Sequence, residues 1–429
     1  MSVNNQDDKK IKVLWLCNLM PSFVGEAMGV KGTNKEGWIS GMYGEVKKHD
    51  DISLAVAFPS DKESKGNALG FAYYSFAEDS EHPENLNETL TKSLRKICDD
   101  FKPDVIHCFG TEYAHTRALL EDDTLRDKAL LHLQGLMEEC EKEYFAGLPE
   151  KIINHNTFRD IVKRDGLRRQ KEKFRLRSEN ENKIISLAKN ICGRTSFDEK
   201  FAKKKNPGAK YFRLNETLRE EFYTGEKWDK DKAVSHRVFV SQGNYPLKGV
   251  HTVIEAAGYL KEKYPDITVN IAGDDIVRDN SLMSLIKLPG YGKYLKSLIK
   301  KYNLTEKVRF IGQQNADGIK RQMLECSVFV LPSFMENSPN SLGEAMLLGV
   351  PCVCSNAGGI PSLADDGKEV LMSNPGDVTK LKDNISKVFD DAKKAKELSE
   401  NGIARAGITH NREKNYEEAL RIYREIAGF

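Results

Sequence analysis

Two glutamates flank a predicted helix start in the second half of the chain. Glu336 lies in a loop, and Glu344 follows eight residues later. Between them, Pro339 precedes Asn340 and Ser341, which are residue types that favour a helix N-terminus. The unpaired N–H groups of such a terminus and the positive end of the helix dipole bind anions, so a diphosphate is the natural ligand.

The spacing of the two glutamates argues against one kind of carboxylate chemistry. Eight helical residues span about 12 Å, whereas the carboxylate pair of a retaining glycosidase lies about 5–5.5 Å apart. Nothing in the loop enforces that shorter distance. We therefore expect Glu336 and Glu344 to bind hydroxyl groups at opposite ends of one elongated, phosphate-containing ligand.

The sequence offers little support for a metal site. The eight cysteines form no Cys-x-x-Cys pair and no Cys/His cluster with zinc spacing. The adjacent carboxylates Asp274–Asp275 and Asp365–Asp366 are more typical of turns. We expect no metal and no cofactor, and we expect the thiols to be buried and reduced.

The elements that position these residues alternate between strand and helix. Short apolar runs predict strands at Lys12–Cys17, Ile52–Phe58, Asp104–Phe109, Ala129–Leu133, Arg237–Ser241, Ile267–Ala272, Lys307–Ile311, Ser327–Leu331 and Pro351–Cys354. Helices are predicted at Trp38–Lys48, Leu86–Asp100, Val250–Lys263, Gly292–Tyr302, Ile319–Glu325, Leu342–Leu348 and Asn415–Ile426. This alternation predicts an α/β protein with parallel sheets covered by helices on both faces.

The strands fall into two series, separated by the polar stretch Tyr223–Ser235, which we interpret as a linker. We expect an N-terminal domain over residues 1–225, a C-terminal domain over 226–410, and a terminal helix over 411–429 that packs back toward the N-terminal domain. The result is two Rossmann-like domains facing a cleft, with ligands bound at the carboxyl ends of the strands.

Composition is that of a globular protein. The 429 residues carry 66 Lys and Arg against 64 Asp and Glu, and 39% of them are hydrophobic. No uncharged apolar run approaches the roughly 20 residues of a membrane helix. The N-terminal 17 residues are polar, mixed in charge and unlike a signal peptide. We expect a cytoplasmic protein.

Positive charge is concentrated in residues 151–210, which contain 18 basic and 7 acidic residues. The densest part, 159–177, is predicted to be helical. A solvated helical face is the ordinary interpretation. The alternative is a patch that binds anionic lipid or a phosphorylated acceptor. Nucleic acid is a less suitable partner, because aromatic residues are not interleaved as stacking platforms.

Several segments resemble one enzyme family. Val308–Ser362 contains a Glu-x7-Glu motif similar to that of retaining GT-B glycosyltransferases of family 4, also called group 1. Val238–Ala256 is similar to the family's strand–loop–Lys-Gly–helix element. Asp104–Glu112 and Gly193–Tyr223 resemble elements of bacterial polysaccharide-type members. The resemblance covers nearly the whole chain and is most specific in the C-terminal half.

The resemblance implies roles in binding a nucleotide-sugar donor. Glu344 would bind the ribose hydroxyls, and Glu336 would bind the donor sugar and place its anomeric carbon. The backbone of Asn340, Ser341 and Leu342 would face the sugar and the diphosphate.

Two further residues match the family pattern. Lys248 corresponds to the lysine that neutralises the leaving diphosphate, although by itself it would be interpreted as a surface lysine at a helix start. Gly37 corresponds to a glycine-rich turn of the N-terminal domain, where bare backbone approaches the donor phosphates or the acceptor.

The sequence departs from the family at two functional positions. The family usually has an arginine where Gln242, Gly243 and Asn244 stand here, so a phosphate contact is missing or comes from elsewhere. Gln134 takes the place of a histidine; it can hydrogen-bond a sugar or the reacting centre but cannot act as a base. His132 would share the face of Gln134 on a strand and is an alternative to it.

The resemblance therefore implies a retaining, metal-independent transfer from a UDP- or GDP-sugar to a glycan or lipid-linked acceptor. In the front-face mechanism proposed for the family, the leaving phosphate oxygen takes the acceptor's proton, so no base is needed. Polysaccharide synthesis at the inner face of the cell membrane would be the setting. The alternatives are a nucleotide-sugar epimerase on the same fold and a catalytically degenerate nucleotide-sugar-binding protein.

Overall fold

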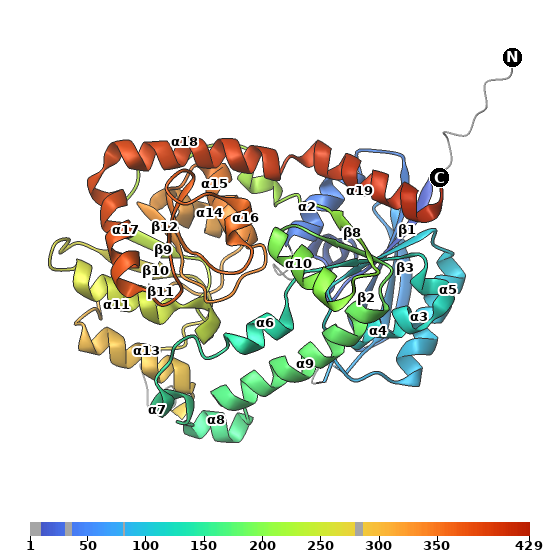
Figure 1. Cartoon of the computed structure of the whole chain (residues 1–429), viewed down its shortest axis with the longest axis horizontal. Helices are drawn as coiled ribbons and strands as arrows, with labels where there is room; N and C mark the ends of the chain where they lie inside the picture. Colours follow the sequence, from blue (N-terminus) through green and yellow to red (C-terminus); the bar gives the residue numbers. More distant parts are fainter. Residues whose placement is uncertain (1–9, 31–36, 80–81, 279–285) are drawn as a thin grey trace, which may run out of the picture. The chain divides into compact units, whose positions relative to one another are not determined.

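The computed structural model describes residues 10–30, 37–79, 82–278 and 286–429. The chain divides into two compact units, each built around one sheet (Figure 1). Unit 1 comprises Met1–Glu138, Leu176–Arg219 and His410–Phe429. Unit 2 comprises Glu139–Arg175 and Glu220–Thr409. The N-terminal tail over residues 1–9, for which we predicted no signal peptide, lies outside the described residues.

The sheet of unit 1 has eight described strands in the order β3-β4-β2-β1-β5-β6-β7-β8. Their bounds are β1 (Ile11–Leu16), β2 (Ile52–Ser60), β3 (Ser64–Ala68), β4 (Phe71–Ala77), β5 (Val105–Phe109), β6 (Ala129–His132), β7 (Asn190–Gly193) and β8 (Lys210–Arg213). All pairings are parallel except β3 with β4. The central strands are buried along their whole length, because helices cover both faces of a parallel sheet.

The helices of unit 1 include one contributed by the end of the chain. Their bounds are α1 (Ser22–Ala27), α2 (Gly37–Val46), α3 (Glu88–Phe101), α4 (Ala114–Glu121), α5 (Asp123–Arg126), α10 (Ser196–Lys205) and α19 (Arg412–Ala427). The core of this unit joins Trp15, Trp38 and Phe109 to Ile422 and Tyr423 of α19. The terminal helix is therefore part of the unit 1 core.

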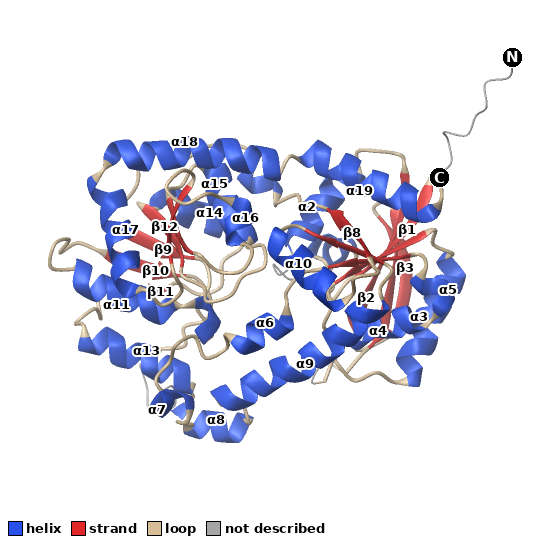
Figure 2. Ribbon diagram, viewed as in Figure 1, coloured by secondary structure: helices blue, strands red, loops and turns tan. Residues whose placement is uncertain are grey.

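The sheet of unit 2 has six described strands, all parallel, in the order β11-β10-β9-β12-β13-β14. Their bounds are β9 (Arg237–Val240), β10 (Thr268–Ile271), β11 (Val308–Phe310), β12 (Val328–Leu331), β13 (Cys352–Ser355) and β14 (Val370–Ser373). Helices lie on both sides of these strands (Figure 2). Parallel strands with covering helices are the Rossmann-like arrangement that the alternating pattern predicted.

The described helices that lie wholly within unit 2 follow or precede the strands of its sheet. Their bounds are α7 (Glu150–Ile153), α8 (Phe158–Lys163), α11 (Val250–Leu260), α13 (Gly290–Lys301), α14 (Ala316–Glu325), α15 (Asn340–Leu348), α16 (Ile360–Leu363), α17 (Val378–Asp390) and α18 (Ala392–Thr409), with 3-10 turns η1 (Glu220–Phe222) and η2 (Pro246–Lys248). Two helices, α6 (Met137–Lys142) and α9 (Leu167–Leu187), have residues in both units.

Every predicted strand is present and five strands were missed, while the helical stretch predicted over 159–177 is divided between α8 and α9. β3, β4, β7, β8 and β14 are short or carry polar residues at positions where the pattern calls for apolar ones. Paired neighbours stabilise such strands, and the local sequence does not reveal that pairing. The fold class is confirmed as α/β with two parallel-strand sheets.

One segment groups differently from the division we drew at residue 225, and another, interpreted as a linker, is packed into unit 2. Glu139–Arg175 belongs to unit 2 although it precedes most of that unit in the chain. Tyr223–Ser235, interpreted as a linker, packs onto unit 2. The Trp228 indole donates to the Cys326 carbonyl oxygen over 2.7 Å, and the Trp228 backbone N–H donates to Leu348 over 2.8 Å.

Among the described residues, no helix combines the length and the apolar character needed to cross a membrane.

Candidate functional site

Unit 2 brings the predicted lysine beside the loop that follows β12. Lys248 ends the 3-10 turn η2, and Gly249, with a φ of +66°, is the N-cap residue that precedes α11. A Cβ at Gly249 would lie 2.0 Å from the carbonyl oxygen of Pro332, so both the conformation and the close approach require glycine. The close approach of Gly249 to Pro332 therefore places Lys248 beside the end of β12.

Lys248 and Glu336 form an ion pair. Their Nζ and Oε1 atoms are 2.6 Å apart, and the Ser333 hydroxyl donates to the same carboxylate oxygen over 2.7 Å. The two side chains are only 16% and 12% exposed. Burial acts to lower the pKa of Lys248, but the adjacent carboxylate of Glu336 outweighs it and raises that pKa above its usual value. The lysine is therefore a fixed cation at neutral pH.

The backbone of the Glu336 loop also forms hydrogen bonds with neighbouring segments. The carbonyl oxygen of Glu336 accepts from the Gly359 N–H over 2.9 Å, and the Phe334 N–H donates to Leu247 over 2.8 Å. Gly358 has a φ of +53°, and a Cβ there would lie 2.0 Å from the Glu336 carbonyl oxygen. Two glycines, Gly249 and Gly358, thus permit the close packing that orients this carboxylate.

The loop leads directly into α15. Its N-cap residue, Pro339, makes no side-chain cap, and one turn is closed by the Leu342 N–H donating to Pro339 over 3.1 Å. The first N–H groups of a helix have no partner within the helix. The side-chain oxygen of Asn340 is buried and has no hydrogen-bond partner among the described residues. This helix start thus offers polar groups suited to an anionic or hydroxylated ligand.

Glu344 lies within α15 and is buried, with 4% of its surface exposed. Ser341 is partly exposed at the start of the same helix, and Leu342 is fully buried. Glu336, Asn340, Ser341, Leu342 and Glu344 therefore lie on one continuous loop and helix. The predicted helix start is correct to within two residues.

The departure from the family arginine lies at the end of β9. Gln242 is exposed, whereas Gly243 is buried, and a Cβ on it would lie 2.7 Å from Ile271. Asn244 has a buried side-chain oxygen without a hydrogen-bond partner among the described residues, while its amide lies 3.4 Å from the carboxylate of Asp274. The carboxylate of Asp274 also accepts from the Gln313 amide over 3.0 Å.

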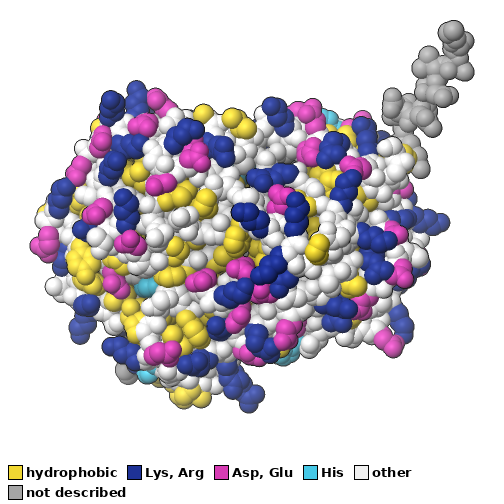
Figure 3. Space-filling model, in the orientation of Figure 1, with side chains coloured by type: hydrophobic (Ala, Val, Ile, Leu, Met, Phe, Trp, Pro, Cys, Tyr) yellow, Lys and Arg dark blue, Asp and Glu magenta, His cyan; other side chains and the backbone are white. Residues whose placement is uncertain are grey.

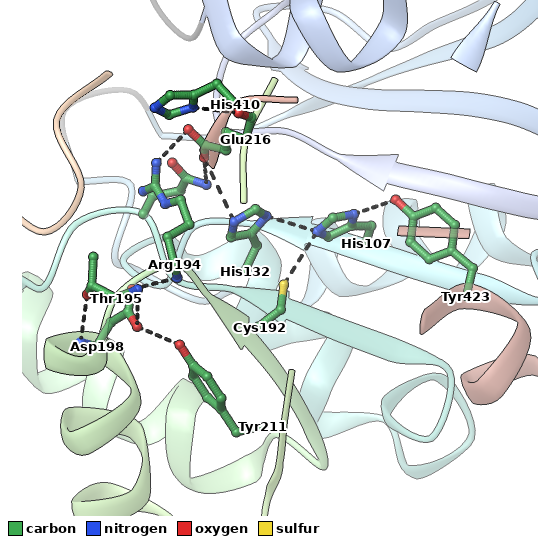
Figure 4. A network of polar contacts seen from close by, with 11 residues as sticks. His107, His132, Cys192, Arg194, Thr195, Asp198, Tyr211, Glu216, His410 and Tyr423 are labelled. Carbon is green, nitrogen blue, oxygen red and sulfur yellow. Dashed lines mark hydrogen bonds and ion pairs between the residues drawn. The ribbon is translucent and has the colours of Figure 1, made fainter. Parts of the chain in front are cut away.

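In unit 1, Gln134 and His132 both lie close to the buried carboxylate of Glu216, and Figure 4 shows His132 beside Glu216. The Gln134 amide donates to Glu216 Oε1 over 3.1 Å, and His132 Nε2 lies 3.8 Å from the same atom. Arg194 donates to the other carboxylate oxygen over 2.5 Å. Sequence reasoning missed Glu216 and Arg194, because nothing in their separation of 22 residues marks them as a pair.

A chain of polar contacts continues from His132 into the core of unit 1 (Figure 4). His132 Nδ1 lies 3.1 Å from His107 Nε2, and His107 Nδ1 lies 2.6 Å from the Tyr423 hydroxyl on α19. Burial lowers the pKa of His107 to about 3 and lowers that of His132 well below its usual value. Both imidazoles are therefore neutral at pH 7.

Two clusters of described residues have metal-ligand side chains with their atoms close together. One is His107, His132 and Cys192, and the other is Glu45, His49 and Glu413. In the first, the nitrogens that face one another are engaged in the hydrogen bond between the two rings. In the second, Lys48 and Arg412 already pair with the Glu45 carboxylate. Neither arrangement supplies an observation that requires an ion.

Gly37 is the first residue of α2 and lies against Arg219 in unit 1. A Cβ at Gly37 would come within 2.5 Å of the Arg219 side chain. The start of α2 at Gly37 is therefore closely packed on the Arg219 stem, a flexible group that moves at low energetic cost.

The buried histidines predict acid sensitivity of the fold. The unfolded chain binds a proton at each histidine with a pKa of about 6.5, whereas native His107 binds one only near pH 3. The native state therefore binds fewer protons, and the free energy of unfolding falls as pH drops below 6.5, by up to about 1.4 kcal/mol per pH unit for this histidine. Chemical denaturation measured from pH 7.5 to 4.5 should show this slope.

The variant His107→Gln should have a shallower slope between these pH values, although its stability at pH 7.5 is lower. His155→Gln, which changes an exposed histidine, is the matched control. A slope identical in His107→Gln and the wild type would contradict this assignment.

The chain is similar to known proteins in sequence and in fold. Residues 225–405 match the family model described as "Glycosyl transferases group 1". The chain is 25% identical over 202 residues to the uncharacterized glycosyltransferase YqgM of Bacillus subtilis, which covers 47% of this chain and 52% of the relative. The chain thus matches only about half the length of that curated relative.

Two solved structures share the fold over nearly the whole chain. Sucrose-phosphate synthase from Thermosynechococcus elongatus is 14% identical with a TM-score of 0.71, covering 97% of this chain and 99% of that one. HepE of Anabaena, solved in complex with UDP and glucose, is 15% identical with a TM-score of 0.64, covering 96% and 99%. The chain has the GT-B fold of these glycosyltransferases.

Proposed function

We propose that the protein is a retaining group 1 glycosyltransferase that moves a sugar from a nucleotide-sugar donor to a glycan or lipid-linked acceptor. The observation that carries this proposal is the buried Lys248–Glu336 pair beside the start of α15. It lies inside the region that matches the family model. A cation, a hydroxyl-binding carboxylate and a helix N-terminus together suit a sugar diphosphate.

In this mechanism Lys248 stabilises the leaving group. The bond between the anomeric carbon and the phosphate oxygen breaks, and the nucleoside diphosphate leaves with the electron pair. A charged ammonium placed where this negative charge develops is worth more in a buried site than in water. Glu336 binds sugar hydroxyls and places the anomeric carbon, while Glu344 binds the ribose.

The acceptor hydroxyl forms the new bond on the face that the leaving group vacates, and its proton passes to the leaving phosphate oxygen. Anomeric configuration is therefore retained, and no side chain has to act as a base. Gln134, held by Glu216, is suited to positioning because an amide donates and accepts hydrogen bonds but does not take up the proton. We assign no metal to this reaction.

The donor is a UDP- or GDP-sugar in this proposal. HepE, which shares the GT-B fold with this chain, was solved with UDP and glucose. Gln242, Gly243 and Gly37 would contribute backbone and amide contacts to the donor. A lipid-linked acceptor for a cell-surface polysaccharide would place the enzyme at the inner face of the cell membrane.

A calorimetric titration tests the donor site. UDP, GDP and their common sugar conjugates are titrated into the wild type and into Glu344→Ala. One nucleotide series should bind the wild type, and its affinity should fall about tenfold to a hundredfold in the variant, because a carboxylate bound to ribose hydroxyls contributes about 1.5–3 kcal/mol.

Glu400→Ala, which changes an exposed glutamate on α18, should bind like the wild type. Folded protein that binds no nucleotide of either series would refute the transferase proposal and favour a degenerate protein. Where a nucleotide sugar binds, release of free nucleotide with acceptor indicates transfer, whereas a changed sugar still attached to the nucleotide indicates an epimerase.

A further inference from the structure

Helix α8 in unit 2 turns apolar side chains to solvent. Phe158, Ile161 and Val162 are 66%, 65% and 64% exposed. Ten large hydrophobic residues are exposed in the described part of the chain, and three of them fall on this helix of six residues. With about 100° between successive residues, the three side chains occupy one arc of the helix surface. A clustered apolar face of this kind usually contacts something.

The opposite side of α8 is polar and fixed to the unit. Asp160 is 4% exposed and completes a capping box with Thr157 at the helix start. Its carboxylate also accepts from the backbone N–H of Gly290, at the start of α13, over 2.9 Å. These bonds hold the polar side inward, so the apolar side cannot turn toward the core. An ordinary surface helix buries its apolar side, whereas α8 buries a polar side and exposes its apolar side.

Basic side chains surround this apolar face. Residues 158–175 contain eight Lys and Arg against three Asp and Glu. Some of the charge is compensated, since Arg159 pairs with Asp160 and Asp165 over 3.2 and 3.1 Å. Lys163, Arg164, Arg169 and Lys173 are exposed and form no salt bridge with another described residue. The lower end of Figure 3, where Figure 1 places α8, carries hydrophobic and basic side chains together.

We propose that α8 and the start of α9 bind the surface of a bilayer that contains anionic lipid. Phe158, Ile161 and Val162 enter the boundary between headgroups and acyl chains, while the uncompensated basic residues contact the lipid phosphates. A short apolar face or a basic patch alone binds a membrane weakly, and stable attachment takes two such signals. Both are present on this one surface, which is complementary in charge to an anionic bilayer.

Vesicle co-sedimentation of the purified full chain tests this proposal. The vesicles are phosphatidylcholine alone, or phosphatidylcholine with about one third phosphatidylglycerol, an anionic lipid. The wild type should sediment with the anionic vesicles and stay in solution with the neutral ones. Because screening weakens the attraction between charges, raising the salt concentration should reduce retention.

Two variants separate the two signals. In Phe158→Ser/Ile161→Ser/Val162→Ser, partitioning onto anionic vesicles should fall by about tenfold or more. In Arg164→Gln/Arg169→Gln/Lys173→Gln it should fall by about a hundredfold, at roughly fivefold for each charge removed. Ile408→Ser, 73% exposed on α18, and Lys204→Gln/Lys230→Gln/Lys393→Gln are the matched controls and should be retained like the wild type.

Sedimentation with vesicles does not require the proposed transferase activity. Nucleotide binding and thermal unfolding of each variant show separately whether the donor site and the fold remain intact. Failure to sediment with anionic vesicles, or equal retention of both variants and the wild type, would overturn the membrane proposal. A wild type that dimerises without vesicles, and that the serine variant converts to monomer, would also overturn it and assign the face to a second copy of the chain.

Discussion

Replacing Lys248 by methionine is expected to lower the turnover number by at least about a hundredfold, the loss seen when one group that stabilises developing charge is removed. Methionine keeps the length and the apolar stem of lysine but has no charge. The leaving diphosphate then departs without its cation, whereas donor binding falls less. The measurement is the rate of nucleotide release at saturating donor and acceptor.

The same change affects the fold, because Glu336 loses its ion-pair partner. Removing one member of a buried pair costs about 3–5 kcal/mol, and partial exposure of this pair reduces that cost. Thermal unfolding of Lys248→Met must therefore be measured beside its rate. Lys248→Arg retains the charge with a different shape and should recover only part of the activity.

Lys393→Met, which changes an exposed lysine elsewhere in unit 2, is the matched control and should be as active as the wild type. Full turnover by folded Lys248→Met would refute the role we propose for this lysine.

Replacing Glu336 by glutamine is expected to lower kcat/KM by about tenfold to a hundredfold, because hydrogen bonds to a charged group contribute about 1.5–3 kcal/mol. The amide still reaches the sugar hydroxyls but accepts their hydrogen bonds less strongly. It also no longer pairs with the Lys248 ammonium, which becomes available to a diphosphate. We therefore expect free nucleoside diphosphate to bind at least as tightly as it does to the wild type.

This opposite effect on binding and on rate distinguishes a role in the site from general damage to the fold. Weaker nucleotide binding together with a lower melting temperature would indicate that Glu336 acts only as a structural partner of Lys248. Ser333→Ala offers a further comparison, since it removes a neutral hydrogen bond to the same carboxylate and keeps the ion pair. Ser333→Ala should lower the rate less than Glu336→Gln does.

The elements of the catalytic proposal were largely predictable because they are local. The pattern around Glu336 and Glu344 places a loop, a helix start and two carboxylates within nine residues, and α15 begins within two residues of the predicted start. Lys248 was singled out by the Lys-Gly element of the resemblance, and in the structure Gly249 is the left-handed N-cap of the helix that follows. Such features depend on neighbours in the chain.

Features that depend on distant residues could not be predicted. The sequence analysis assigned Lys248 to a phosphate and Glu336 to a sugar, but their contact joins residues 88 positions apart. The hydrogen bond from Gln134 to Glu216 likewise joins residues that are 82 positions apart. The placement of Glu139–Arg175 in unit 2 likewise depends on long-range packing. No local pattern encodes any of these, because side chains meet only after the strands have paired.

The amino-acid sequence by itself determined that this protein alternates strands and helices in two series and carries an acidic motif at a helix start. Hydrophobic periodicity and helix capping act over a few residues, so they can be read directly. Only the tertiary structure decided which buried charges pair and which face of α8 remains in solvent. The direction of that face depends on the bond between Asp160 and Gly290, which are 130 positions apart and therefore not linked by any periodicity in the sequence.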